Sequence, residues 1–236
     1  MRELLRVSSL WGGYKEEVDV LQGIDMSVQD GETVGIIGLN GSGKSTLGKA
    51  IMNMIPFRKG RIKFNGEDVT GLSTHELARK GLAIMQQGGQ VFRNLSVWEN
   101  MEIAYASGSS LSRIKDAFPL LQRPKRELQH LMADKLSGGQ KHELALVMAF
   151  ASDPKLIILD EPSAGLSPKA VEEMYGTLRV MRERMKFTVL LIEQNVAKAL
   201  SFCDMCHVLQ QGKVIESVMQ SDFHSIDRIM FNKIGL

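Results

Sequence analysis

Residues 38–46 of this chain read GLNGSGKST, and this stretch decides the fold that we expect. It satisfies the pattern G-x-x-x-x-G-K-S/T, in which a glycine-rich loop joins a strand to a helix. The preceding run VGII, residues 34–37, is continuously apolar, as in a strand that is buried in a parallel sheet. The following residues, 45–54, have a helical pattern that ends before Pro56. The sequence therefore predicts a P-loop protein of the α/β class.

The glycines of this loop let the backbone curl so that successive N–H groups converge on a polyphosphate. The helix that follows adds further donors and about half a positive charge. We expect Lys44 to contact the β- and γ-phosphates and Ser45 to hold a magnesium ion. A dinucleotide-binding fingerprint is excluded because Thr46 stands where its third glycine is needed. The residues expected to bind nucleotide here are Gly38, Asn40, Gly41, Ser42, Gly43, Lys44, Ser45 and Thr46.

The composition is that of an ordinary globular protein and does not indicate any particular binding partner. The 236 residues include 29 Lys and Arg and 27 Asp and Glu, and the resulting net charge of +2 is too small for a sequence-independent nucleic-acid binder. Apolar runs such as residues 156–159 and 189–192 are far shorter than the roughly 20 residues of a membrane span. The start, Met1-Arg2-Glu3-Leu4, places an acid where a signal peptide has basic residues. We therefore expect a cytoplasmic protein without a nucleic-acid partner.

The rest of the chain alternates strand and helix patterns. Residues 5–28 alternate apolar and polar positions, which predicts antiparallel strands that meet at a Gly12-Gly13 turn. Further strands are expected at residues 61–64, 82–85, 156–159 and 188–192 and in a hairpin over 205–218, with helices at 74–80, 139–152, 168–185 and 196–202. Residues 96–106 and 111–132 instead predict two helices with no strand between them.

This pattern predicts one domain over residues 1–236 with a mostly parallel core sheet. The core and an N-terminal antiparallel β subdomain would occupy residues 1–95 and 136–236, and an inserted helical subdomain would occupy 96–135. Such alternation is typical of α/β layer proteins.

Two carboxylates end the apolar strand at residues 156–159. Asp160 is expected to face the magnesium ion, directly or through water. Glu161, one residue further, could polarise the attacking water as a general base. Together with the phosphate loop, this pair indicates an enzyme that hydrolyses a nucleotide.

A second anion-binding sequence, LSGGQ, occupies residues 136–140 and opens a helix. One nucleotide cannot use both loops, so the economical arrangement is a head-to-tail pair of subunits. Ser137, Gly138, Gly139 and Gln140 would then close on ATP held by the partner's phosphate loop. A P-loop, LSGGQ and a Leu-Asp-Glu strand end, in this order, resemble the ATP-binding cassette (ABC) ATPases over essentially the whole chain.

The resemblance implies roles for further residues. Tyr14 is similar to the aromatic residue that stacks on adenine in this family, and Trp11 is the alternative because the register is ambiguous around the glycines. Gln87 is similar to the glutamine that senses magnesium and the γ-phosphate, with Gln86 as the alternative.

The sequence Glu193-Gln194-Asn195 stands where most family members carry a histidine. Gln194 is therefore expected at the catalytic site, where it can hydrogen-bond a γ-phosphate but cannot carry a proton. These residues, together with the segments 91–100 and 118–121, resemble the branched-chain amino-acid or urea type of importer ATPase. The stretch Gln87-Gly88-Gly89-Gln90 departs from that type, which usually has a glutamate and then basic residues there, so the transported substrate stays open.

The resemblance implies ATP and Mg²⁺ as cofactors. It implies transmembrane permease subunits and a second ABC ATPase subunit, identical or different, as partners, with an extracytoplasmic substrate-binding protein acting indirectly. The chain would lie on the inner face of the cell membrane as a peripheral protein. Alternatives are urea import, lipid or lipopolysaccharide export, and a soluble ABC clamp. A P-loop kinase would have no use for LSGGQ, and a structural protein would not need Asp160 and Glu161.

Overall fold

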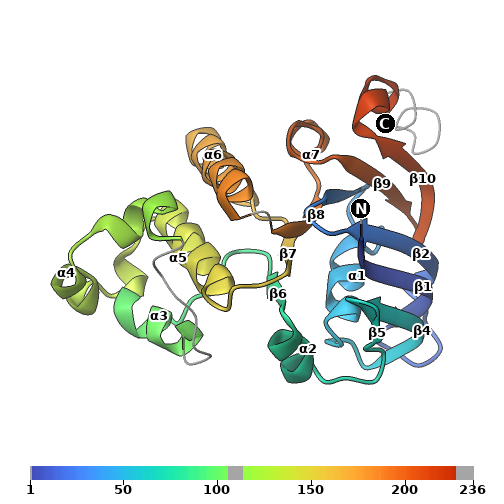
Figure 1. Ribbon diagram of the computed structural model, residues 1–236, viewed down its shortest axis with the longest axis horizontal. Coiled ribbons are helices and arrows are strands. Elements are labelled where there is room, and N and C mark those ends of the chain that lie inside the picture. The colour runs from blue at the N-terminus through green and yellow to red at the C-terminus, as the bar shows by residue number, and fades with distance from the viewer. Residues whose placement is uncertain (1, 106–113, 186, 227–236) are drawn as a thin grey trace. The chain divides into compact units, whose positions relative to one another are not determined.

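The computed structural model describes residues 2–105, 114–185 and 187–226. The chain forms two compact units, which are described separately below (Figure 1). Unit 1 combines Met1–Lys80 with Thr188–Leu236, and unit 2 consists of Gly81–Phe187. The predicted single domain with a helical subdomain at residues 96–135 stays a prediction.

Unit 1 contains the expected antiparallel sheet, with strand order β2-β1-β4-β5. Its strands are β1 (Glu3–Gly13), β2 (Leu21–Gln29), β4 (Phe57–Phe64) and β5 (Glu67–Asp68). The turn predicted at Gly12-Gly13 is wrong, because both glycines are the last residues of β1 and the chain reverses over residues 14–20. A Cβ atom on Gly13 would lie 2.1 Å from the carbonyl oxygen of Val18. The glycines are needed for close backbone approach, and not for a turn.

The core strands of unit 1 are β3 (Thr33–Ile37), β8 (Thr188–Glu193), β9 (Met205–Gln210) and β10 (Lys213–Met219). Strand β3 pairs in parallel with both β8 and β9, and β10 pairs antiparallel with β9. Every residue of β3 and β8 is buried, as the apolar runs predicted. The helices are α1 (Lys44–Ile51), α2 (Thr74–Lys80) and α7 (Val196–Phe202), followed by the 3-10 segment Gln220–Ser225.

Unit 2 contains the parallel strands β6 (Leu82–Met85) and β7 (Leu156–Asp160) and three longer helices. These helices are α3 (Val97–Tyr105), α5 (Gly138–Ala151) and α6 (Pro168–Met185). The single helix predicted over residues 111–132 is wrong for the residues that are described from 114 onward. That region forms 3-10 segments at Lys115–Ala117 and Pro119–Gln122, the short helix α4 (Lys125–His130), and another 3-10 segment at Ala133–Lys135. Pro119 and Pro124 each begin a new segment because proline cannot continue a preceding helix.

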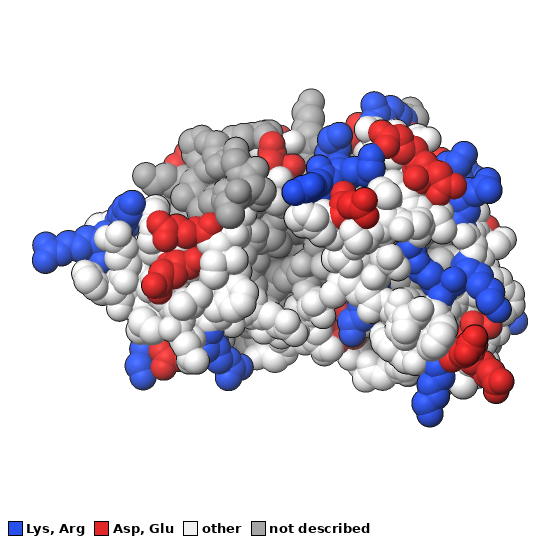
Figure 2. Space-filling model, turned by 90° about the horizontal axis from the view of Figure 1, so that it is seen from below, with Lys and Arg blue, Asp and Glu red and all other residues white. Residues whose placement is uncertain are grey.

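The described helices include none with the length and apolar character that crossing a bilayer requires. On the face drawn in Figure 2, basic and acidic side chains lie interspersed, in keeping with the net charge of +2.

Candidate active site

The phosphate loop joins β3 to α1 in unit 1, as predicted, and its glycines are required by its geometry. Gly38 has a φ of 153°, and a Cβ atom there would lie 2.2 Å from the carbonyl oxygen of Leu209. The turn between β9 and β10 braces the other end of the loop, because the N–H of Gly212 donates to the carbonyl of Ser42 at 2.8 Å. The loop is therefore held from both ends by the β9-β10 hairpin.

Lys44 and Ser42 point polar groups into this loop. Lys44 is only 4% exposed, and its Nζ donates to the carbonyls of Gly38 and Leu39 at 2.9 Å each. The Oγ of Ser42 is buried and has no hydrogen-bond partner among the described residues. The N-terminus of α1 has Gly43 as its cap and no side-chain cap hydrogen bond. The Ser42 hydroxyl, the Lys44 ammonium group and the N–H groups at the start of α1, which has no side-chain cap, are together suited to bind a polyphosphate.

Unit 1 also holds the predicted adenine-stacking residues and Gln194. Tyr14 is 49% exposed in the turn after β1, whereas Trp11 is 38% exposed and covers the backbone of Gly23 with its indole. The choice between these two aromatics stays a prediction. Gln194 is exposed and directly follows Glu193, which is in register with Ile37 at the start of the phosphate loop. The pairing of β3 with β8 thus brings Gln194 to the same strand ends as the loop.

The predicted carboxylates lie in unit 2. Asp160 is the last residue of β7 and is 2% exposed, and Glu161 follows it with a φ of 46°, in the left-handed region. The Nε2 of Gln87 donates to Oε2 of Glu161 at 2.8 Å. The parallel register of Met85 with Leu159 accounts for this contact, because Gln87 and Glu161 each lie two residues beyond that registered pair. The structure therefore brings together the predicted base and the predicted magnesium-sensing glutamine.

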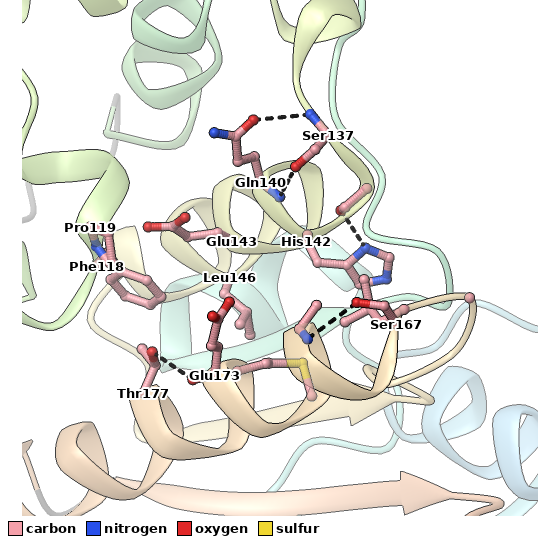
Figure 3. A pocket seen from close by; sticks show the side chains of 16 residues that line it. Phe118, Pro119, Ser137, Gln140, His142, Glu143, Leu146, Ser167, Glu173 and Thr177 are labelled. Carbon is pink, nitrogen blue, oxygen red and sulfur yellow. Dashed lines mark hydrogen bonds between the residues drawn. The ribbon is translucent and has the colours of Figure 1, made fainter.

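The LSGGQ segment begins α5, also in unit 2. A capping box fixes it: the N–H of Gln140 donates to Ser137 Oγ at 3.3 Å, and the N–H of Ser137 donates to Gln140 Oε1 at 3.0 Å. Gly138 has open space at its Cβ position, and Gly139 meets only the methyl group of Ala170 at 3.5 Å. These residues line a cavity of about 740 Å³ between α5 and α6, shown in Figure 3. The start of α5 is thus preformed and approachable by an anion.

Two residues of α5 were not singled out from the sequence. His142 Nδ1 donates to the carbonyl of Gly138 at 3.1 Å, while its buried Nε2 has no partner among the described residues. Glu143 accepts a hydrogen bond from the N–H of Leu120 at 2.5 Å, and burial raises the pKa of this carboxyl. Figure 3 shows both side chains along the cavity wall. Neither residue belongs to a sequence motif, so no signal in the sequence pointed to them, and only their contacts in the structure identify them.

The predicted site residues are therefore divided between the two units. Unit 1 contains Tyr14, the phosphate loop from Gly38 to Thr46, and Gln194. Unit 2 contains Gln87, the segment Ser137–Gln140, Asp160 and Glu161. The roles predicted for these residues stay predictions.

Comparison with known proteins supports the same class of protein. A profile described as "ABC transporter" matches residues 21–164, which include the phosphate loop, LSGGQ and the strand with Asp160 and Glu161. The chain belongs to this family, and it is the ATP-binding and ATP-hydrolysing component of a transporter. A solved ATP-binding cassette of an ABC transporter is 26% identical with a TM-score of 0.84, covering 98% of this chain and 97% of that chain. The predicted α/β P-loop fold of the ABC ATPases is confirmed.

Two curated relatives have different stated substrates. A protein of Archaeoglobus fulgidus, named as a probable branched-chain amino acid transport ATP-binding protein, LivF, is 36% identical over 217 residues. That match covers 89% of this chain and 90% of the relative. The lipopolysaccharide export system ATP-binding protein LptB of Acidithiobacillus ferridurans is 33% identical over 226 residues, covering 91% of this chain and 90% of the relative. The family is thereby established, and the transported substrate is not.

Proposed function

We propose that this chain hydrolyses ATP between two subunits in head-to-tail contact and thereby drives import of branched-chain or other amino acids through separate membrane subunits. The observation that carries the ATPase part is the phosphate loop with its inward Lys44 and unpartnered Ser42 hydroxyl. The similarity to LivF supports the amino-acid part.

In this proposal, the residues of unit 1 bind and orient ATP. The loop N–H groups and Lys44 hold the β- and γ-phosphates, and Tyr14 stacks on adenine. Lys44 would then exchange the two loop carbonyls for phosphate oxygens. Gln194 would hydrogen-bond the γ-phosphate and hold the attacking water in line.

The residues of unit 2, together with Ser45 of unit 1, would complete the chemistry. The hydroxyl of Ser45, the carboxylate of Asp160 and the amide oxygen of Gln87 are the hard oxygen donors that Mg²⁺ prefers. When bound, Mg²⁺ would supply positive charge to the phosphate oxygens. Glu161 would take a proton from the attacking water. Because Gln87 donates through Nε2 to Glu161, its Oε1 is left free of that bond.

The LSGGQ segment supports the two-subunit part of the proposal. Ser137, Gly138 and Gly139 lie at the N-terminus of a helix that runs to Ala151, where backbone N–H groups attract anions. In a head-to-tail dimer this end would meet the γ-phosphate bound by the partner subunit. That contact exists only before hydrolysis, so ATP would favour the closed dimer and its hydrolysis would release it.

An uncharged hollow in unit 2, in which Gln86 and Gln90 accompany apolar lining residues, supports a membrane partner. It has a volume of about 540 Å³, and its described lining residues carry no charge. Met85, Val91, Phe92 and Met148 contribute the larger apolar side chains, and Phe92 is 52% exposed. Flexible methionines and an exposed aromatic ring suit a short apolar helix. We therefore assign this surface to a cytoplasmic helix of the permease, which would hold the chain on the inner face of the membrane.

The experiment is to purify this chain with its permease subunits in mild detergent and to measure ATP turnover with candidate ligands and their binding protein. Branched-chain amino acids should stimulate turnover, while urea and lipopolysaccharide should not. Stimulation by lipopolysaccharide alone would instead assign the chain to export, the activity named for LptB. A monodisperse complex that no amino acid stimulates would contradict the import proposal and leave the ATPase assignment intact.

A further inference from the structure

His142 is a buried histidine of α5 to which the proposed function assigns no role. The residue is 7% exposed, and its Nδ1 contacts the carbonyl oxygen of Gly138 at 3.1 Å (Figure 3). A carbonyl oxygen can only accept, so Nδ1 is the donor in this bond. The other ring nitrogen, Nε2, is buried with no partner among the described residues. A buried nitrogen without a partner lowers stability, and an apolar ring of similar size would avoid that loss. The imidazole therefore holds the first turn of α5 at a cost that packing alone does not require.

The turn that carries Gln87 rests on this histidine. The N–H of Gly89 donates to the carbonyl of Gln86 at 3.3 Å and closes the turn. A Cβ atom on Gly89 would lie 3.2 Å from Cα and 3.3 Å from Cγ of His142, which is closer than ordinary van der Waals contact. Because Gly89 has no side chain, the turn lies directly against the backbone and the ring of His142.

The same turn also reaches the predicted base, because Gln87 Nε2 donates to Oε2 of Glu161 at 2.8 Å. A continuous series of contacts within unit 2 therefore joins Glu161, Gln87, Gly89, His142 and Gly138. In the proposed function, the Glu161 end of this series acts on the ATP bound by the same chain. The Gly138 end meets the ATP bound by the partner subunit.

We propose that His142 is a positioning residue that couples the two ATP sites of the head-to-tail dimer. This inference rests on the proposed function. A γ-phosphate at the start of α5 would fix Gly138, and the bond from Nδ1 would fix the imidazole with it. Because the turn is packed against that ring, the ring would set the position of Gln87 beside Glu161. In this arrangement His142 acts through Gln87 and not on the nucleotide.

The coupling predicts a selective effect on catalysis. The phosphate loop that would hold ATP belongs to unit 1, whereas His142 and its contacts belong to unit 2. Loss of the imidazole bond should therefore lower kcat and leave ATP affinity unchanged. The net contribution of one neutral hydrogen bond corresponds to a decrease of about three- to tenfold.

The first test replaces the histidine in the full chain. His142→Phe keeps a ring against Gly89 and removes the donor, whereas His142→Asn places an amide nitrogen close to the position of Nδ1. His130→Phe and His130→Asn, at the exposed end of α4 in the same unit, are the matched controls. For each variant the measurements are kcat and KM of ATP hydrolysis, affinity for a fluorescent ATP analogue, and melting temperature.

Gly88 and Gly89 provide a second test within one turn. Their φ values are 84° and 56°, so alanine strains the backbone at either position. A Cβ atom has open space at Gly88 but would press on His142 at Gly89. Gly89→Ala should therefore lower kcat more than Gly88→Ala. The double variant Gly89→Ala/His142→Phe should lower kcat by less than the product of the two single effects, because both changes interrupt one series of contacts. The glycine pair keeps the inference testable should His142→Phe fail to fold.

His142→Phe should lower kcat about three- to tenfold with unchanged KM, and His142→Asn should restore kcat to within about twofold of the wild-type value. Both His130 variants should match the wild type. A wild-type kcat in His142→Phe would overturn the inference. Parallel losses of kcat, ATP affinity and melting temperature would also overturn it, because they would indicate a structural role alone.

ATP-dependent dimerisation of Ser137→Ala separates this inference from the proposed function. Reduced dimerisation of Ser137→Ala, together with wild-type kcat in the His142 variants, would overturn the coupling and leave the head-to-tail dimer standing. Normal dimerisation of Ser137→Ala would overturn both.

Discussion

Protonation of His207 should destabilise unit 1 at mildly acidic pH. This residue of β9 is 4% exposed, its Nδ1 contacts Ser217 Oγ at 2.7 Å, and its Nε2 is buried with no partner among the described residues. Burial lowers its pKa from 6.5 to about 4, because the imidazolium would lose its hydration. His207 lies opposite Ile36 of β3, close to the start of the phosphate loop. Its charge state therefore affects the strands that position Lys44.

The sign and size of the effect follow from the two pKa values. Above pH 6.5 the residue is neutral in both states and stability does not depend on it. Between pH 6.5 and 4 the unfolded chain binds a proton that the folded chain excludes, so the free energy of unfolding falls as the pH falls. The difference of about two and a half pKa units corresponds to a loss of about 3 kcal/mol by pH 4. This is a large part of the 5–15 kcal/mol typical of folded domains.

The assay is urea unfolding between pH 7.5 and 4.5 in a Trp98→Phe background, so that the fluorescence of Trp11 reports on unit 1. His207→Gln removes the titrating group, and His75→Gln removes an exposed histidine of the same unit as the control. The wild-type chain and the His75 variant should lose stability in parallel, and the His207 variant should lose about 2.5 kcal/mol less down to pH 4.5. Equal pH slopes for all three proteins would show that burial of His207 does not cause the loss of stability.

Three further changes test the nucleotide site. Lys44→Ala should weaken ATP binding by roughly tenfold or more in a titration with fluorescent nucleotide, and unchanged affinity would count against the phosphate loop. Gly38→Ala should lower the free energy of unfolding by about 2 kcal/mol because its Cβ would meet the Leu209 carbonyl at 2.2 Å, whereas Gly71→Ala, which has open space, should be neutral. Ser137→Ala should remove the cap of α5, cost about 1 kcal/mol in thermal unfolding and reduce ATP-dependent dimerisation, and Ser137→Thr should largely restore both.

The parts of the fold that the sequence predicted correctly are those with strong local signals. Strands β3 and β8 are continuous apolar runs, and the helix Pro168–Met185 has helical spacing of its apolar residues. In each case the signal lies within the element itself and does not depend on distant residues. The turn at Gly12-Gly13 was wrong because a glycine that permits close approach looks the same in sequence as a glycine in a turn. The helix over 111–132 was wrong because the apolar spacing continued through two prolines.

For the site, the sequence predicted which residues take part and could not predict their contacts. The motif at residues 38–46 placed Lys44 at the start of a helix, and the structure adds its hydrogen bonds to Gly38 and Leu39. The bond between Gln87 and Glu161 joins residues that are 74 positions apart, and it depends on strand register. Likewise, Gly89 and His142 belong to no motif, and only packing of the loop on α5 brings them together.

Glu161 should activate the water that attacks ATP, and single-turnover hydrolysis by Glu161→Gln measures this role. The substituting amide can still accept the hydrogen bond from Gln87, so the loop geometry should be retained. Glu183→Gln, at an exposed position on α6, is the matched control. The hydrolysis rate of Glu161→Gln should be lower by about 10²–10⁴-fold, with unchanged ATP affinity and accumulation of closed dimers. Hydrolysis by this variant at close to the wild-type rate would show that Glu161 is not the base.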